Sequence, residues 1–187
     1  MIPWERVGAS VSTKIDRQEA AVLRGLVGQI DDILQARLGE APQDELTELT
    51  GIRTGPPTAP EDPILSRLLP DFHRLDNEDA SKDDRDSAAV LRSLHEPELL
   101  DHKTGVAGVL LDTCPPGGGL VKLSAEQADA WLSALNDVRL ALGTTLGVTE
   151  EMPDDLPDDD PRAPHLGVYH WLTWMQESLV TALSGDE

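Results

Sequence analysis

Cysteine is almost missing from this sequence: Cys114 is the single one among 187 residues. An intramolecular disulfide and a cysteine-based zinc cluster are therefore excluded within these residues. Basic residues are also scarce, with 15 Lys and Arg against 35 Asp and Glu, and the formal net charge is −20. Such a chain repels the phosphates of duplex DNA, so we expect no direct nucleic-acid binding. A basic surface of a protein partner would suit it far better.

Long apolar runs are missing as well. The first residues, MIPWERVGAS, contain no apolar signal-peptide segment, and no run elsewhere approaches the length of a membrane span. We therefore expect a cytoplasmic protein without a membrane partner. The length fits a single domain over residues 1–187. Acidic or Pro-rich composition predicts mobile loops near residues 40–63, 76–87 and 149–163.

Two segments share one pattern, a short alternating run followed by a capped helix. Asp16 and Glu19 have capping-box spacing at the start of the first helix, and Ser124 and Gln127 repeat it at the start of the second. The first helix should end near Gly39. Its apolar residues recur at helical spacing and predict a buried face made of Ala20, Leu23, Val27, Ile30 and Leu34. The two alternating runs could pair as a β-ribbon.

The remaining segments predict further helices. GIRTGPPTAPEDP (51–63) is a loop by composition, and a short helical element follows it and breaks at Pro70. Residues 87–114 predict two helical pieces, the first capped by Ser87 and the second with Pro97 in its first turn. PPGGG (115–119) then forms a turn. A last amphipathic helix should have one side formed by Trp171, Trp174, Met175, Ser178 and Ala182.

These elements define a mainly α fold, a compact helical bundle of about five helices with a short two-stranded β-ribbon. Residues 130–147, AWLSALNDVRLALGTTLG, are apolar nearly all round, as in a central buried helix. A buried Arg139 must be paired, and the last helix offers two candidate partners. We interpret five residues as a structural polar network that fixes the register of the two helices: Asn136, Asp137, Arg139, Gln176 and Glu177. The alternative is a binding or catalytic role for Arg139.

The sequence contains only weak indications of a metal site or a redox-active cysteine. His95, Glu98 and His102 could share a helix face, but their spacing matches no zinc signature, so we expect no metal and no cofactor. His165 and His170 near Asp160 match none either. Cys114 is a candidate redox residue. However, the negative end of a helix and nearby Asp112 should raise the pKa of its thiol, which favours an inert, half-buried side chain.

Several blocks resemble an actinobacterial family catalogued as domain of unknown function 2017 (DUF2017). The two clearest are WLSALNDVRLALGTTLGV and PRAPHLGVYHWLTWMQESLVTAL, supported by DPILSRLLPDFHR, AAVLRSLHEPELLDHK and GGGLVKLSAEQA. The resemblance implies a non-enzymatic cytosolic regulator in oxidative stress or sulfur metabolism. It implies action by protein–protein interaction, with a sigma factor or the transcription machinery as partner.

Two other functions stay open at this point. The family's gene neighbourhood suggests an adaptor linked to Clp proteolysis, and a small enzyme could use Arg139 with buried carboxylates. The resemblance also implies a cysteine pair that senses oxidation, and here the sequence departs from the family pattern. Because Cys114 has no second cysteine to pair with, only intermolecular pairing or a cysteine-independent role remains.

Overall fold

The computed structural model describes residues 2–41, 51, 53–72, 81–149, 151–153, 156–157 and 159–185. Its helices and strands follow the order β1 (Glu5–Val7), β2 (Ser10–Ile15), α1 (Arg17–Leu38), α3 (Pro63–Leu68), α4 (Lys82–Thr113), β3 (Gly119–Ser124), α5 (Ala125–Leu146) and α6 (Ala163–Ser184). The predicted mainly α fold is therefore confirmed. That the chain forms one domain with mobile loops stays a prediction.

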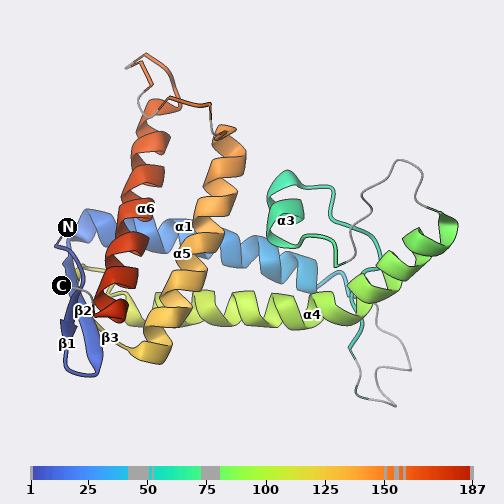
Figure 1. Ribbon diagram of the computed structural model, residues 1–187, viewed down its shortest axis with the longest axis horizontal. Coiled ribbons are helices and arrows are strands. Elements are labelled where there is room, and N and C mark those ends of the chain that lie inside the picture. The colour runs from blue at the N-terminus through green and yellow to red at the C-terminus, as the bar shows by residue number, and fades with distance from the viewer. Residues whose placement is uncertain are drawn as a thin grey trace.

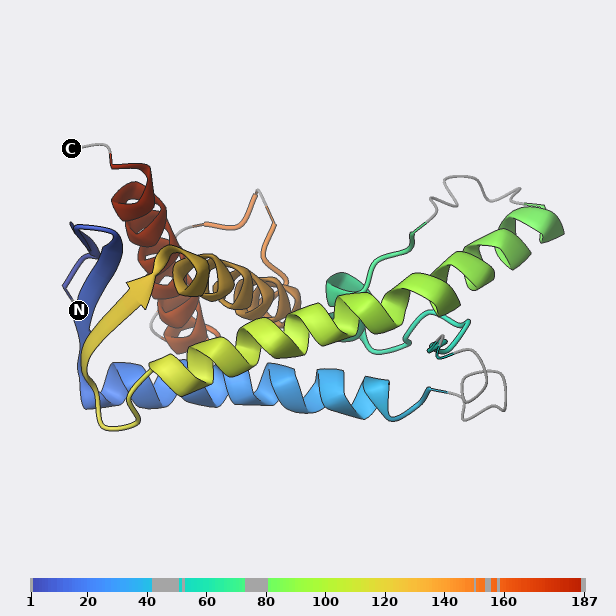
Figure 2. The ribbon, with the colours of Figure 1, turned by 90° about the horizontal axis from the view of Figure 1, so that it is seen from below.

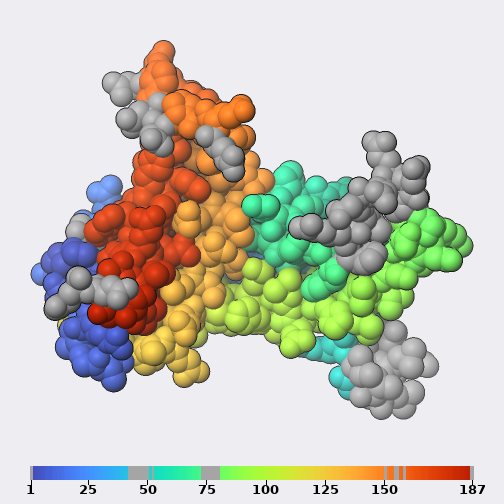
Figure 3. Space-filling model, viewed as in Figure 1, coloured from blue at the N-terminus to red at the C-terminus, as the bar shows by residue number. Residues whose placement is uncertain are grey.

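Two long helices form the base of the molecule. α1 and α4 run side by side in opposite directions along the longest axis, and α4 continues past the end of α1 (Figures 1 and 2). α5 packs across this pair and also contacts α3 and α6. Figure 3 shows α5 and α6 stacked over one half of the base, while the first turns of α4 extend to the other end. α5 is thus the central helix, as its apolar sequence predicts.

A small antiparallel sheet closes the end of the molecule where both termini lie (Figure 1). β2 pairs with β3, from Ser10 opposite Ser124 to Ile15 opposite Gly119, so the expected ribbon is confirmed. β1 adds a third strand on the other side of β2, which the sequence analysis did not predict. Gly118, with φ of +74°, makes the turn into β3 against the backbone of Asp16, where a Cβ would lie 2.6 Å from its carbonyl carbon.

The predicted helix signals are confirmed in both strand–helix units. Asp16 and Glu19 form a reciprocal capping box on α1, and Ser124 and Gln127 form one on α5. α1 ends at Gly39. All five apolar residues predicted for the buried face of α1 are buried, together with residues from every other long helix. The core is therefore continuous from the sheet to the middle of α4.

The predicted break within residues 87–114 is wrong, because α4 is one helix of 32 residues with Pro97 inside it. Ser81, not Ser87, is the N-cap, and residues 82–87 are helical where a loop was expected. Proline has no N–H for the carbonyl of Ser93, one turn earlier. The N–H of Gly55 donates to that carbonyl instead, at 2.7 Å. α4 bends between its green first turns and the rest, in keeping with an internal proline (Figure 1).

The last helix is rotated slightly from the predicted orientation. Met175 and Ala182 are buried as expected, but Trp174 is 39 % exposed. Leu172 and Leu179 take its place in the core. The buried face therefore follows 172, 175, 179 and 182, the three-and-four spacing of leucine, methionine and alanine rather than the spacing of the tryptophans.

Candidate functional site

The predicted polar residues of α5 divide between two neighbouring helices. Arg139 is half-buried and faces α6, where its Nε donates to Thr173 at 3.1 Å and its Nη1 donates to Gln176 at 2.5 Å. Its guanidinium also lies 5.6 Å from the ring centroid of Tyr169. Gln176 in turn donates to the carbonyl of Leu132 at 3.3 Å. These contacts join α5 to α6.

Asp137 faces the opposite helix. Its side chain is buried against α4 and accepts a hydrogen bond from Nζ of Lys103 at 2.6 Å. Burial raises the pKa of Asp137, and the hydrogen bond and charge of Lys103 only partly oppose this. Asn136 and Glu177 are exposed. The predicted pairing of Arg139 with Gln176 is therefore present, but the five residues do not form one network. Arg139, Asp137 and Glu177 do not converge on one cavity as the enzyme alternative requires.

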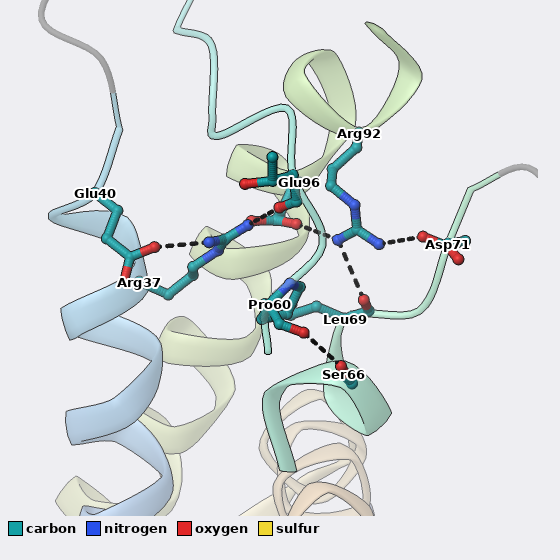
Figure 4. A network of polar contacts seen from close by, with 9 residues as sticks. Arg37, Glu40, Pro60, Ser66, Leu69, Asp71, Arg92 and Glu96 are labelled. Atoms are coloured by element: carbon teal, nitrogen blue, oxygen red, sulfur yellow. Dashed lines mark hydrogen bonds and ion pairs between the residues drawn. The ribbon is translucent and has the colours of Figure 1, made fainter. Parts of the chain in front are cut away.

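A buried ion-pair cluster lies elsewhere and was not predicted from the sequence. Glu96, in the middle of α4, is fully buried and accepts from Nε of Arg37 at 2.7 Å and from Nη1 of Arg92 at 2.5 Å (Figure 4). Arg92 also donates to Asp71 at 2.6 Å, and Arg37 to Glu40 at 2.6 Å. We call these five residues the Glu96 cluster.

The Glu96 cluster fixes four segments at one point. Arg37 is in the last turn of α1, and its Nη2 donates to the carbonyl of Thr58 in the loop before α3. Arg92 reaches the carbonyl of Leu69 just after α3. Burial lowers the pKa of Arg37, but the hydrogen bonds and charges of Glu96 and Glu40 outweigh it and raise the pKa above its usual value. Both guanidinium groups donate to acceptors on other segments of the protein, so the arrangement is that of a clamp between helices.

Cys114 lies at the C-cap of α4 and is only 1 % exposed, so it is more deeply buried than expected. Burial raises the pKa of its thiol, whereas the charge of Arg24 acts in the opposite direction. Arg24 donates to the carbonyl of Cys114 at 2.6 Å and so fixes the end of α4 against α1. The thiol is both shielded from solvent and held in the protonated form. This is the opposite of what a redox-sensing cysteine needs.

The predicted histidine groups do not gather metal ligands. His95, Glu98 and His102 line a shallow hollow on α4 together with Phe72. Asp160 is paired with Arg162, whose hydrogen bonds lower the pKa of Asp160 to about 2. Across the described part of the chain, no three His, Cys, Asp or Glu side chains are placed to hold a metal ion. No helix in that part is long and apolar enough to cross a membrane.

An open groove of about 590 Å³ lies where α5 crosses the second half of α4. Small or apolar residues from both helices form its floor: Gly105, Val106, Val109, Ala130 and Ser133. Exposed carboxylates form its rim: Asp101, Asp112, Glu126 and Asp129. In Figure 3, the gold first turns of α5 and the yellow-green part of α4 border a notch at the lower edge of the molecule. We call this feature the α4–α5 groove.

The fold and these sites define a class: a strongly acidic, mainly helical protein whose buried ion pairs hold its helices together and whose surface has an acidic groove. The model of the family described as "Domain of unknown function (DUF2017)" matches residues 1–183. The chain therefore belongs to this family.

Curated relatives extend the comparison over nearly the whole chain. It is 45 % identical over 192 residues to the oxidative stress regulator AosR of Mycobacterium tuberculosis (strain ATCC 25618 / H37Rv), an alignment that covers 98 % of this chain and 88 % of the relative. It is 44 % identical over 189 residues to the putative oxidative stress regulator AosR of Mycobacterium leprae, covering 96 % and 87 %. No solved structure matches the chain.

Proposed function

We propose that this chain is a cytoplasmic, non-enzymatic regulator of the oxidative stress response that acts by binding another protein. The partner that we propose is a sigma factor or another component of the transcription machinery, with genes of sulfur metabolism among its targets. The observation that carries the proposal is the 45 % identity to proteins named oxidative stress regulators over 98 % of this chain. A shared fold over this length makes a shared type of action the simplest expectation.

The contacts of α5 support a regulator over an enzyme. A catalytic arginine or carboxylate needs a free face toward a substrate. Arg139 instead has its guanidinium directed at Thr173 and Gln176 of α6, and Asp137 is buried beside Lys103. Buried polar groups need hydrogen-bond partners, and these contacts supply them. The net charge of −20 further favours a basic protein as partner over nucleic acid.

The proposed regulation does not depend on a thiol switch within this chain. Cys114 is the single cysteine among the 187 residues, and it is buried with a raised pKa. A peroxide-sensing thiol must be exposed and ionised, and Cys114 is neither. We therefore propose that the oxidative signal reaches this regulator through its partner or through its own abundance.

The test is genetic and then biochemical. Deletion of the gene in the host should alter the induction of oxidative-stress transcripts by peroxide, and both the wild-type gene and Cys114→Ser should restore it. Unchanged transcripts in the deletion strain would overturn the regulator. Failure of Cys114→Ser alone would overturn the cysteine-independent mechanism. A tagged protein should co-purify with a sigma factor or RNA polymerase, and recovery of Clp components instead would favour the proteolysis adaptor.

A further inference from the structure

We infer that the α4–α5 groove is the docking site for a basic amphipathic helix of the partner protein. This inference rests on the proposed function and adds the surface that performs it. The floor of the groove is apolar or small and includes Val106, Val109 and Ala130. Apolar side chains of a partner helix can pack against this floor. The acidic rim then favours basic side chains on either side of them.

The spacing of the lining residues makes the groove fit a helix. On α4 they recur at 101/102, 105/106, 109 and 112/113, and on α5 at 126/127, 129/130 and 133, so each wall is one face of a helix. From Asp101 to Thr113 the α4 wall is about 18 Å long, at 1.5 Å per residue. That is room for about three turns of a partner helix. Neither wall offers a free strand edge, so an extended peptide would find no main-chain partners there.

The groove is open because its floor lacks large side chains. A Cβ added at Gly105 would meet no atom within 4 Å, and Gly105 is exposed. The two walls are fixed relative to each other by a hydrogen bond: Nε1 of Trp131 on α5 donates to Oγ1 of Thr113 on α4 at 2.7 Å. The buried Lys103–Asp137 pair joins the same two helices. A partner therefore meets a preformed surface and does not have to order it first.

Charge selects the occupant. Asp101 is already paired with Arg53, but Asp112, Glu126 and Asp129 have no ion-pair partner in the part of the chain that the structure describes. A second copy of this chain would also carry a net charge of −20, and so would repel the rim. The segment at residues 150–160 is acidic too, with seven carboxylates, so it is not a suitable occupant from within the chain. Lysine and arginine flanking an apolar helix stripe fit both the rim and the floor.

Two variants of the full chain test the groove by shape and by charge. Gly105→Leu fills the floor at a position open to solvent, and its matched control is Gly25→Leu on α1, which is also helical, exposed and free of neighbours within 4 Å. Asp112→Lys/Asp129→Lys reverses two rim charges. Its control, Asp32→Lys/Glu177→Lys, makes the same change of four charge units at exposed positions outside the groove. Circular dichroism and thermal melting confirm that each variant is folded.

The probe is a fluorescent synthetic peptide of about 14 residues, with leucines on one helix face and lysines on the other. Anisotropy should show saturable binding, at least about tenfold weaker for Gly105→Leu and for the Asp112/Asp129 variant, and unchanged for both controls. A peptide of the same composition with the helical pattern scrambled should bind at least about tenfold more weakly. Equal binding of the two peptides, or equal binding by the groove variants and their controls, would overturn the inference.

Failure of this inference is distinguishable from failure of the proposed function. If Gly105→Leu restores peroxide-induced transcription in the deletion strain as well as wild type does, the regulator stands and the groove is not its docking site. If the deletion changes no transcript, the regulator itself is wrong, whatever the peptide measurements show.

Discussion

Removal of the charge of Glu96, with its shape retained, isolates the contribution of the Glu96 cluster to stability. In Glu96→Gln the side chain still fills its site on α4, but Arg37 and Arg92 lose the carboxylate that they share at 2.7 and 2.5 Å. Both arginine side chains are about 95 % buried. Loss of one partner from a buried ion pair costs about 3–5 kcal/mol. Arg37 and Arg92 keep only the half-exposed carboxylates of Glu40 and Asp71, and these solvated partners offset little of that loss.

The expected loss is easily measured. For a chain of this length, 1 kcal/mol shifts the melting temperature by about 2–4 °C, so Glu96→Gln should lower it by roughly 6–20 °C. Urea unfolding followed by circular dichroism gives the free energy independently. The control is Asp101→Asn, which breaks the exposed pair with Arg53 and should cost less than about 1 kcal/mol.

Two results would refute the reasoning on the Glu96 cluster. The first is a free energy of unfolding for Glu96→Gln within about 0.5 kcal/mol of wild type, which would mean that the cluster is solvated and weak. The second concerns Arg37→Met/Arg92→Leu/Glu96→Leu, in which all three buried charges are replaced and only the half-exposed carboxylates of Glu40 and Asp71 remain. This triple variant should be more stable than Glu96→Gln, since apolar replacement of all the buried members of an ion-pair cluster is often neutral. A less stable triple variant would contradict the account.

Three smaller predictions follow from the same contacts. Gly118→Ala should destabilise the protein by at least about 1 kcal/mol, because φ is +74° and the added Cβ would clash with Asp16. Gly25→Ala on α1 should instead stabilise it by about 0.5–1 kcal/mol. Equal free energies of unfolding for the two variants in urea would contradict this. The raised pKa of Asp137 means that the folded state holds its proton more tightly, so the stability contributed by that proton is present below pH 3.8 and is lost as the pH rises through the folded pKa. The free energy of wild type relative to Asp137→Asn should therefore fall over that window, and a rise would show that the charge of Lys103 outweighs burial. Native Cys114 should react with a thiol reagent at pH 8 many times more slowly than in urea, and equal rates would show that the thiol is accessible.

Local signals in the sequence were sufficient for the helix starts and for one buried face. The capping boxes at Asp16 and Ser124 involve residues three apart, and both form as expected. The buried face of α1 follows directly from the spacing of its apolar residues. Signals of this kind are complete within one turn or one helix, so no knowledge of the tertiary fold is needed.

Pro97 shows where local reasoning fails. A proline with a preceding polar segment predicts a helix start, yet α4 passes through it without interruption. The reason lies about 40 residues earlier in the chain, where the N–H of Gly55 takes up the carbonyl that Pro97 leaves unbonded. A Cβ at position 55 would lie 3.3 Å from the Pro97 ring, so glycine fits there best. Nothing near Pro97 in the sequence reveals this partner.

The contacts of the buried polar residues were even harder to predict from the sequence. Arg92 and Glu96 have the i, i+4 spacing that could have indicated the Glu96 cluster, but many exposed pairs share that spacing. The Arg92–Glu96 pair is buried because Arg37 of α1, which is distant in the sequence, packs against it and binds Glu96. The same applies to Asp137, which faces α4 and not α6. The position of a polar residue on a helix predicts its face, but not which helix covers that face.

The most direct test that the regulator binds the transcription machinery through the α4–α5 groove is photo-crosslinking from that groove in living cells of the host. A photoreactive amino acid placed at Gly105, where the added side chain has open space, should crosslink to a sigma factor or RNA polymerase subunit after peroxide treatment. The same amino acid at Gly25 on α1 should give no such adduct. A transcription component crosslinked at 105 and not at 25 is the result that the account predicts. Adducts to that component from both positions or from neither would contradict it.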